Sequence, residues 1–448
     1  MRRENYRGAA RFYGEALKRS PKFFPALIEG ALAHGHLGEV AVARDWLSRA
    51  RDSAKGNSAN EVGVASGYFK ISEFGVAREI LEGLWERERK DEVGIALAEL
   101  CERTGDLTRG LEALGGVKLP RAELLRGILM RRSGDWSAAR RSFERAFGGT
   151  GDGEVRTRYR AGLELGRCYE NGGEYERAWD TMLAAKALVG PGELDARKLD
   201  RQFERSMKEG LASYEGWKWI ESEVNGISPY LLSGHPRSGT SVCALHLAND
   251  LKAQDIDEIG SFARVMDAMR LSGVPPQKLK RSKTEQFRSA YREKMRAFMP
   301  ELNEGRIWLD KNPGLERFGA YWLKVFPNSK IYLVRRNLLD TVISCLFTYV
   351  GLNCFSYQFF DAERAAKSVE WSLCLQDKLI EKAPGAVEVI DFEDFLSKRL
   401  GQEVNSDGRV LHSPNYGEAL KPLHGEAIGR WEGYQDLLPK ELVARFGK

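Results

Sequence analysis

The eight residues GHPRSGTS at positions 234–241 decide the fold of the second half of this chain. They follow a short apolar run, PYLLS, and precede an apolar stretch with helical spacing from Val242 to Leu251. An apolar strand, a glycine-containing turn and a helix in this order are typical of a domain with alternating strands and helices. From Ser228 onward further short apolar runs alternate with helical patterns, so the sequence predicts an α/β domain with a central parallel sheet.

The turn between this strand and helix predicts a phosphate-binding loop. The backbone N–H groups of a glycine-rich turn and the positive end of the next helix point at one place, which favours a phosphate. The spacing from Gly234 to Gly239 is that of the nucleotide P-loop, but Thr240 stands where NTPases have a lysine. Arg237 offers a different cation inside the loop. A P-loop kinase or NTPase is therefore the alternative rather than the preferred interpretation.

The loop resembles the 5′-phosphosulfate loop of sulfotransferases that use 3′-phosphoadenosine 5′-phosphosulfate (PAPS), commonly PRSGT followed by Ser or Thr. The resemblance implies an enzyme that moves a sulfonate group from PAPS to an acceptor hydroxyl by in-line transfer, without a required metal. The residues that it implies for donor binding in this loop are Gly234, Pro236, Arg237, Ser238, Gly239, Thr240 and Ser241.

A second apolar run, IYLV, leads into RRNLLDTVIS at positions 335–344. A ribose 3′-phosphate needs a guanidinium fork and a hydroxyl or helix-end donor, which an arginine at a strand end and a serine on the next helix can supply. Arg336 and Ser344 have the spacing of the 3′-phosphate motif of the same family, and Leu338 replaces its common proline. The resemblance therefore implies that Arg336 and Ser344 hold the 3′-phosphate.

Between these motifs lies RIWLDKNP at positions 306–313. An apolar strand ending in Asp310 also fits a Walker B acid, as the NTPase alternative would require. The sulfotransferase pattern Asp/Asn-Lys-x-Pro fits better, and it implies that Lys311 stabilises charge on the bridging oxygen and the sulfonate. Arg237 is the second cation expected at the sulfonate.

Transfer to a hydroxyl requires a base near the acceptor. The small-molecule branch of the family uses a histidine, but no histidine of this chain lies where that branch would place it. The tyrosylprotein branch and its bacterial repeat-bearing relatives use a glutamate shortly after the first helix. That resemblance implies Glu258 as the base, with Asp257 as its nearest rival.

Three further roles are implied near the end of the chain. Arg430 precedes Trp431 as in the segment whose basic residue contacts the nucleotide phosphate. Ser413 is the candidate for a serine that helps to hold the sulfonate, although its interval to Pro422 is long. Phe392 stands where many relatives have a tyrosine near the adenine, so a stacking contact is expected there.

The first half carries a pattern that recurs five times: a turn residue, an acidic or aromatic pair, then alanines and large apolar residues with helical spacing. The turn residues are Gly38, Ser72, Gly105, Gly134 and Gly173, at steps of 34, 33, 29 and 39 residues. This period predicts helix-turn-helix units whose glycine takes the left-handed conformation. The pattern resembles degenerate tetratricopeptide repeats, and an irregular helical domain is the alternative. Such a scaffold is expected to bind a protein partner or substrate.

At 448 residues the chain exceeds one ordinary hydrophobic core. We expect a tetratricopeptide-like domain at residues 1–190, a charged helical connector at 191–226 and a sulfotransferase domain at 227–448. The repeat pattern begins almost at Met1, which leaves open that the natural chain is longer at this end. A non-catalytic repeat adaptor with a degenerate transferase domain is a further alternative.

The overall composition limits the kinds of binding partner that the sequence predicts. The net charge of +5 is a small difference between 69 basic and 64 acidic residues, which predicts neither a general nucleic-acid surface nor a membrane surface. The six cysteines have no metal-ligand spacing, and no segment has the ~20 uninterrupted apolar residues that span a bilayer. We therefore expect a cytoplasmic protein without a metal. Its acceptor carries a hydroxyl and is a peptide, a glycan, a lipid or a small molecule.

Overall fold

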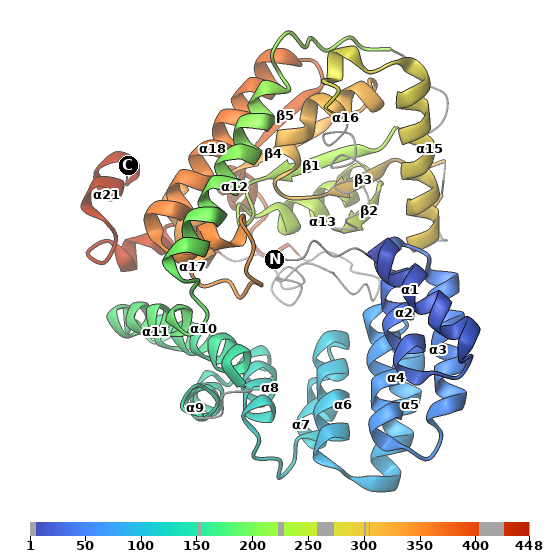
Figure 1. Cartoon of the computed structure of the whole chain (residues 1–448). Helices are drawn as coiled ribbons and strands as arrows, with labels where there is room; N and C mark the ends of the chain where they lie inside the picture. Colours follow the sequence, from blue (N-terminus) through green and yellow to red (C-terminus); the bar gives the residue numbers. More distant parts are fainter. Residues whose placement is uncertain are drawn as a thin grey trace. The chain divides into compact units, whose positions relative to one another are not determined.

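A computed structural model of the chain describes residues 6–149, 154–222, 228–257, 273–299, 302–303, 305–402 and 425–447. The chain forms two compact units, Met1–Gly172 and Gly173–Lys448, whose elements are labelled in Figure 1. The first unit is helical and the second holds the sheet. The predicted fold class, an all-α repeat-like array followed by an α/β domain with a central parallel sheet, is confirmed.

The first unit is built from consecutive helices joined by short turns. The helices are α1 (Tyr6–Arg19), α2 (Phe24–Leu37), α3 (Val40–Ala54), α4 (Ser58–Lys70), α5 (Phe74–Glu88), α6 (Asp91–Thr104), α7 (Leu107–Ala113), α8 (Pro120–Arg132), α9 (Trp136–Phe147) and α10 (Val155–Asn171).

The turn residues of the repeated pattern share one backbone conformation. The φ angle is 81° at Gly38, 85° at Gly105, 91° at Gly134 and 74° at Gly173, which confirms the predicted left-handed turns. Ser72 takes the same conformation, with φ at 67°, although its Cβ makes this region costly. All five copies therefore have the same turn geometry, even where one lacks the glycine.

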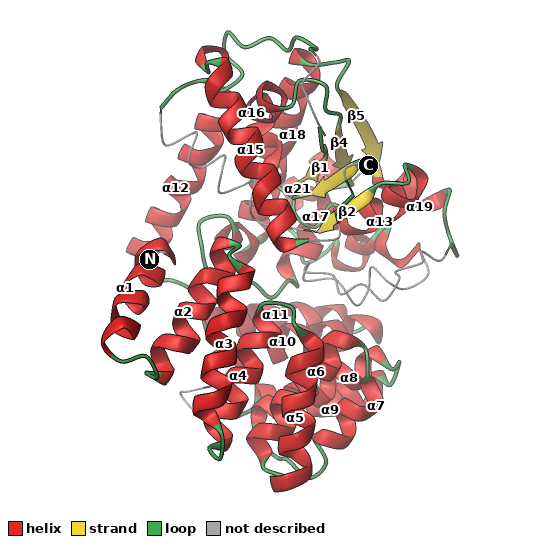
Figure 2. Ribbon diagram, turned by 90° about the vertical axis from the view of Figure 1, so that its right-hand side faces the viewer, coloured by secondary structure: helices red, strands yellow, loops and turns green. Residues whose placement is uncertain are grey.

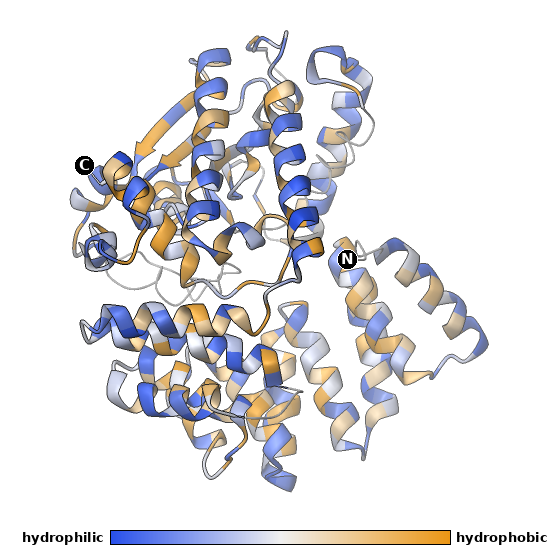
Figure 3. Ribbon diagram, turned by 60° about the vertical axis from the view of Figure 1, so that its left-hand side comes forward, coloured by the Kyte–Doolittle hydropathy of each residue, from blue (hydrophilic) through white to orange (hydrophobic). Residues whose placement is uncertain are grey.

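Helices of neighbouring copies pack through small apolar residues and ion pairs. The alanine five residues after the turn is fully buried in four copies, at Ala43, Ala77, Ala139 and Ala178. Arg78 pairs with Asp106 at 2.9 Å and Arg109 with Glu82 at 2.5 Å, so that each pair joins residues about one repeat apart. Each partly exposed pair contributes only about 0–1 kcal/mol, and apolar burial contributes most of the stability. Figure 3 shows the alternating hydrophobic and hydrophilic patches along these helices.

The second unit contains the remaining elements. Its strands are β1 (Tyr230–Gly234), β2 (Gln254–Asp257), β3 (Trp308–Lys311), β4 (Ile331–Arg335) and β5 (Val387–Asp391). Its α-helices are α11 (Tyr175–Ala187), α12 (Glu193–Ala212), α13 (Thr240–Asp250), α15 (Arg281–Phe298), α16 (Gly319–Val325), α17 (Leu338–Leu346), α18 (Ala362–Lys382), α19 (Phe392–Ser397) and α21 (Lys440–Phe446). Its 3₁₀ turns are Pro276–Lys278, Leu315–Phe318, Ser356–Phe360, Gly425–Ala427 and Arg430–Tyr434. Within the described ranges, no helix of the chain is both long and apolar enough to traverse a bilayer.

The strands, drawn in yellow in Figure 2, form one sheet. Their order is β2-β3-β1-β4-β5, and every neighbouring pair is parallel. β1 is central, and four of its five residues are buried. The face that carries Leu231 and Trp308 packs on side chains of α15 and α16. The opposite face, with Leu232, packs on α13 and α19. Both faces are covered, as is usual for a parallel sheet.

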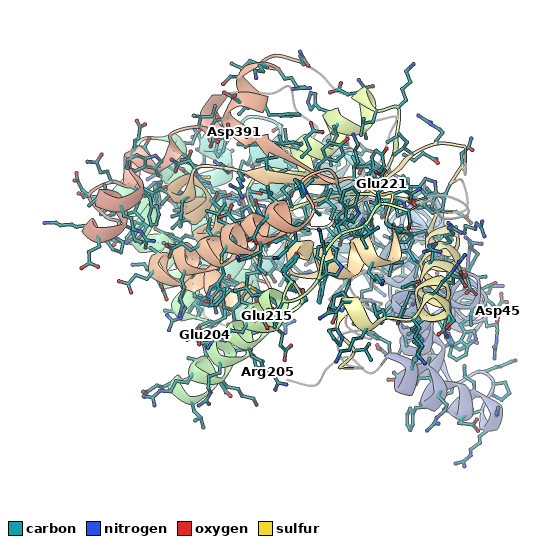
Figure 4. The ribbon with its side chains drawn as sticks, turned by 90° about the horizontal axis from the view of Figure 1, so that it is seen from above. Asp45, Glu204, Arg205, Glu215, Glu221 and Asp391 are labelled. Carbon is teal, nitrogen blue, oxygen red and sulfur yellow. The ribbon has the colours of Figure 1, made fainter. Side chains whose placement is uncertain are left out.

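The carboxyl ends of parallel strands meet at one edge of the sheet. β1 ends there at Gly234, β3 at Lys311 and β4 at Arg335. β2 ends at Asp257 and β5 at Asp391, which is labelled in Figure 4. Open α/β sheets bind their ligands outside this edge. The strand order therefore brings the predicted motifs together.

Two helices of the second unit are joined by ion pairs. Arg364 of α18 lies 3.3 Å from Asp200 of α12, and Lys367 lies 2.6 Å from Glu204, which is labelled in Figure 4. The segment that the sequence assigns to a charged connector thus contains a helix that is paired with α18 within the second unit.

Helix α11 also packs within the second unit. The ring of Tyr175 lies 5.2 Å from that of Tyr434 in an edge-on contact, and the ring of Trp179 lies 6.1 Å from it. The boundary between the compact units falls between Gly172 and Gly173, before α11. The repeat pattern, in contrast, places α11 in the domain at residues 1–190.

Candidate functional site

The loop between β1 and α13 has a constrained backbone. The φ angle is 79° at Arg237 and 96° at Gly239, both in the left-handed region. A Cβ at Gly239 would lie 2.2 Å from the ring of Phe392, so only glycine fits there. α13 begins directly afterwards at Thr240, and the unpaired N–H groups of its first turn lie at the loop. The segment has the form of a phosphate-binding turn.

Phe392 differs from its expected role. Its ring is only 3% exposed, packs against Gly239 and lies 5.2 Å from the guanidinium of Arg336. It leaves almost no surface on which an adenine could stack. The stacking prediction is therefore wrong for this ring, which instead supports the loop and Arg336.

The two predicted phosphate motifs are in direct contact. Nε of Arg237 donates to Oγ of Ser344 at 3.1 Å. Nη1 of Arg336 donates to the backbone oxygen of Arg237, also at 3.1 Å. Arg237 of the phosphate loop thus contacts both Arg336 and Ser344.

Arg336 is half-buried as a residue but its Nε is fully buried, and its environment favours an anion. Another of its N–H groups donates to the backbone oxygen of Ala427, but Nε has no partner among the described residues. Burial lowers the pKa of Arg336, and the nearby guanidinium of Arg430 lowers it further. A buried guanidinium with an unused donor is costly unless a bound anion accepts from it.

Arg335, next in the chain, has a different role. Its Nε donates to the side-chain oxygen of Gln376 at 3.0 Å, and a second nitrogen lies 2.5 Å from the carboxylate of Asp377. Both partners lie on α18. Arg335 therefore holds the end of β4 to α18, while Arg336 faces the loop.

The start of α17 is fixed without the usual proline. Oδ1 of Asn337 accepts from the N–H groups of Leu339 at 2.9 Å and Asp340 at 3.1 Å, which caps the helix. The N–H of Asn337 donates to Glu393 at 3.0 Å. The side chain of Asn337 thus fixes the first turn of α17, although Leu338 stands where the family motif commonly has a proline.

Asp340 ties the end of the chain to this helix. Its two carboxylate oxygens accept from the N–H groups of Gly429 and Trp431, each at 2.9 Å. Arg430 lies between them in sequence, and its guanidinium is 5.4 Å from the ring of Phe347, which directly follows α17. This clamp brings Arg430 to the helix that carries Ser344.

Lys311 ends β3 next to the phosphate loop. Its side chain is only 1% exposed, and Nζ donates to Oγ of Ser241 at 3.2 Å. The following residues are bonded to β1: the N–H of Asn312 donates to Leu232 at 3.0 Å, and that of Gly314 to Gly234 at 2.8 Å. Lys311 is therefore held in a fixed position relative to the loop.

A buried carboxylate below the loop was missed from the sequence. Glu316 is 3% exposed and accepts from the hydroxyls of Ser233 at 2.9 Å and Ser372 at 2.6 Å. Ser233 also accepts from the N–H of Leu315 at 3.0 Å. These bonds connect β1, the segment after Lys311 and α18. An acid in an apolar helical pattern gives no local signal of such a role.

Asp310 does not face the loop. It is fully buried and accepts from the hydroxyl of Tyr291 at 2.8 Å and from the amide of Asn312. Burial raises its pKa to about 7. Side chains alternate along a strand, so Asp310 and Lys311 point to opposite faces of the sheet. This placement does not favour the Walker B interpretation.

Among the described residues, no group of three or more His, Cys, Asp or Glu side chains could hold a metal ion.

His235 anchors the loop. Its ring nitrogens lie 2.8 Å from Oγ of Ser368 and 2.5 Å from the backbone oxygen of Pro236. Burial lowers its pKa to about 4, so the ring is neutral near pH 7. These contacts are structural and leave no ring nitrogen for an acceptor hydroxyl.

The predicted base lies at the border of the described residues. Asp257 pairs in register with Lys311 at the ends of the parallel strands β2 and β3. Glu258, next in the chain, lies outside the described residues, as does Ser413. The register places the end of β2 beside the lysine.

The chain was compared with known proteins, and a family match lies over most of the residues that build this site. No curated protein matches the chain. Residues 229–402 match the model of the Sulfotransferase family. The matched stretch contains β1, the phosphate loop, Lys311, Arg336 and Ser344. The match supports a sulfotransferase-family assignment, and with it a transferase activity, for the unit that carries the phosphate loop.

Proposed function

We propose that the protein is a PAPS-dependent sulfotransferase of the tetratricopeptide-repeat-bearing bacterial branch related to tyrosylprotein sulfotransferases, acting in the cytoplasm. One observation carries the proposal: Arg237, Ser344 and Arg336 form a connected group at the edge of the sheet. A nucleotide with a phosphate at each end requires two anion-binding motifs close together, and a triphosphate does not.

The residues present fit such a donor. Arg336 Nε and Ser238 Oγ are both buried, and neither has a partner among the described residues. Each is a donor that an anionic oxygen would satisfy. The residues proposed to hold the donor are Gly234, Pro236, Arg237, Ser238, Gly239, Thr240, Ser241, Arg336, Ser344 and Arg430.

The chain's own residues then have distinct tasks in the transfer. The bound donor supplies an electrophilic sulfonate, whose sulfur bonds to the acceptor oxygen as its bond to the phosphate oxygen breaks. Glu258 takes the proton of the acceptor hydroxyl. Lys311 and Arg237 stabilise the negative charge on the sulfonate and on the departing phosphate oxygen. The buried position of Lys311 strengthens this effect, because charges interact more strongly away from water.

The register of Asp257 with Lys311 supports a base at the end of β2. Glu258→Gln and Asp257→Asn distinguish the two acids. Loss of turnover in the first variant alone, with nucleotide affinity retained, is the expected result. Loss in the second alone would move the role to Asp257, and full activity of both would show that neither acid is the base. Nucleotide binding without turnover in the natural protein would point to a non-catalytic adaptor.

The helical array is proposed to be of the tetratricopeptide type and to bind a protein partner or the acceptor. The five shared turn conformations support this assignment. The acceptor is a hydroxyl-bearing peptide, glycan, lipid or small molecule.

The function is tested with PAPS that carries a ³⁵S label. The protein is incubated with this donor and a cell extract, and the labelled products are separated by size. Transfer of label, abolished in Glu258→Gln, supports the proposal. Calorimetry with adenosine 3′,5′-bisphosphate and with Mg-ATP separates the rivals, because binding of Mg-ATP alone would support a kinase or NTPase.

A further inference from the structure

Lys186, on α11, is a buried cation outside the motifs described above. Its side chain is only 4% exposed, and Nζ donates to the backbone oxygen of Phe359. The ammonium lies 5.2 Å from the ring centre of Phe360. An ammonium has three N–H donors, and among the described residues Phe359 supplies the one acceptor. Burial therefore leaves most of its hydrogen-bonding capacity unused.

The groups that surround Lys186 do not balance its charge. On the segment before α18, the carboxylate of Asp361 acts on Lys186, but it is paired with Arg364 and also accepts the N–H of Arg364 at 2.8 Å. On α17, the thiol of Cys345 has a pKa of about 12 because it is buried, so it stays neutral. Burial accordingly lowers the pKa of Lys186 to about 7.

Lys186 is linked to the phosphate loop through two neighbours, Phe359 and Cys345. Cys345 follows the predicted 3′-phosphate residue Ser344, and its Sγ lies 3.9 Å from the backbone oxygen of Pro236 in the loop. The ring of Phe359 lies 5.9 Å from that of His235, which is neutral near pH 7.

The site's own cations also lie near this thiol. Arg237 and Arg336 both act electrostatically on Cys345, as Lys186 does. The charged groups around Cys345 are thus three cations, and no unpaired carboxylate lies among its described neighbours.

We propose that Lys186 is a further member of the donor site, a buried ammonium that becomes charged when the anionic nucleotide binds in front of it. The inference rests on the proposed function, since it needs a nucleotide with two phosphates. Without a bound anion, a buried ammonium near two half-buried arginines is unfavourable. A bound ligand with several negative charges reverses this balance, and water exclusion strengthens the attraction.

The expected pH dependence has a defined sign. In the free protein Lys186 is largely neutral above pH 7 and charged below it. Binding raises its pKa, so binding takes up a proton, and uptake grows from ~0.1 proton at pH 6 toward ~0.9 at pH 8. Phosphate groups lose their second proton near pH 6, so they contribute little at pH 8. Nucleotide affinity should fall by up to roughly tenfold per pH unit above pH 7.

The test uses calorimetric titration of the full chain with adenosine 3′,5′-bisphosphate at pH 8. Buffers with different ionisation enthalpies, such as Tris and HEPES, reveal the number of protons taken up. The expected result is close to one proton for the natural protein. Lys186→Arg keeps a permanent charge and should bind without uptake, and Lys186→Met should also bind without uptake but more weakly. Lys378→Met, at an exposed lysine paired with Glu381, is the matched control and should retain the uptake.

Each outcome decides between the two proposals. If the bisphosphate does not bind at all, the proposed function fails. Binding without proton uptake by the natural protein overturns the role of Lys186 and leaves the function intact. Uptake that persists in Lys186→Arg would also overturn it, because another group would then carry the proton.

Discussion

Nε of Arg237 donates to Oγ of Ser344 at 3.1 Å, although the two residues are 107 positions apart. The contact joins the loop after β1 to the helix after β4, two neighbouring strands of the sheet. Because Arg336 also holds the backbone of Arg237, the two motifs form one site. Substitutions in one motif should therefore affect ligands held by the other.

Lys311 is expected to act in turnover more than in binding. Lys311→Met removes the charge beside Ser241, and the rate of sulfonate transfer should fall by roughly 10²–10³-fold. Affinity for adenosine 3′,5′-bisphosphate, measured by calorimetry, should change much less. Lys330→Met, at an exposed position on the opposite edge of the sheet, is the control. Equal losses in the two variants would contradict a catalytic role.

Arg336 should determine recognition of the second phosphate. Arg336→Lys loses the guanidinium fork, so affinity for adenosine 3′,5′-bisphosphate should fall by roughly 10–100-fold. Affinity for the 5′-monophosphate, which lacks the 3′ group, should fall less. Arg335→Lys is the neighbouring control, because Arg335 is bonded to α18. An unchanged ratio of the two affinities in Arg336→Lys would remove the assignment.

Gly239→Ala should destabilise the second unit. The new Cβ would lie 2.2 Å from the ring of Phe392 and would have to keep φ at 96°. Together these effects should cost about 3 kcal/mol or more. Gly401→Ala, at φ 74° with open space, should cost only about 1 kcal/mol.

Scanning calorimetry measures the midpoints of thermal unfolding of Gly239→Ala and Gly401→Ala. The substitution Phe392→Leu tests whether the clash with the ring causes the loss of stability. If the clash is the cause, the loss from Gly239→Ala should be smaller in the Phe392→Leu background than in the natural protein. Strictly additive losses would mean that backbone strain alone is responsible.

Asp340 and Arg430 should act as a unit. Asp340→Ala releases the N–H groups of Gly429 and Trp431, so Arg430 loses its position beside α17. Nucleotide affinity should fall by roughly tenfold, and Arg430→Ala should add little to that loss. A double-mutant cycle by calorimetry measures the coupling. Two independent, additive losses would show that the clamp does not place Arg430.

Asp310 should make stability depend on pH. Its pKa is about 7 in the folded chain, above the ordinary value of 3.8, so the folded state binds more protons between these values. Stability from this group is therefore greatest at low pH and is lost as pH rises to about 7. Asp310→Asn cannot titrate, so its stability relative to the natural protein should improve by at least about 1 kcal/mol from pH 5 to pH 8. Asp377→Asn, at an exposed site, is the control, and parallel curves for Asp310→Asn would contradict the expectation.

Local sequence patterns predicted which segments meet at one edge of the sheet, because parallel-strand geometry brings those segments together. Apolar runs that end in Gly234, Lys311 and Arg335 were sufficient, because parallel strands bring their carboxyl ends to one edge. The turn pattern of the array succeeded for a similar reason. A left-handed residue after each first helix is a local requirement, and Ser72 meets it without being glycine.

Contacts between distant segments could not be predicted in this way. Lys186 and Phe359 are separated by 173 positions, and nothing near either residue indicates that they meet. The role of Phe392 was misassigned because family position says nothing about its contact with Gly239. Glu316 was missed for the same reason, since its serine partners come from two other elements.

The packing of α11 in the second unit determines where the helical array can be separated from that unit. α11 carries both Lys186 and Tyr175, and the ring of Tyr175 contacts the turn that bears Arg430. A transferase fragment cut at residue 190 would lose this helix, whereas one that begins at Gly173 would keep it. Recombination that swaps one helical array for another should therefore leave the last helix of the repeat pattern with the second unit, and the two should be inherited together.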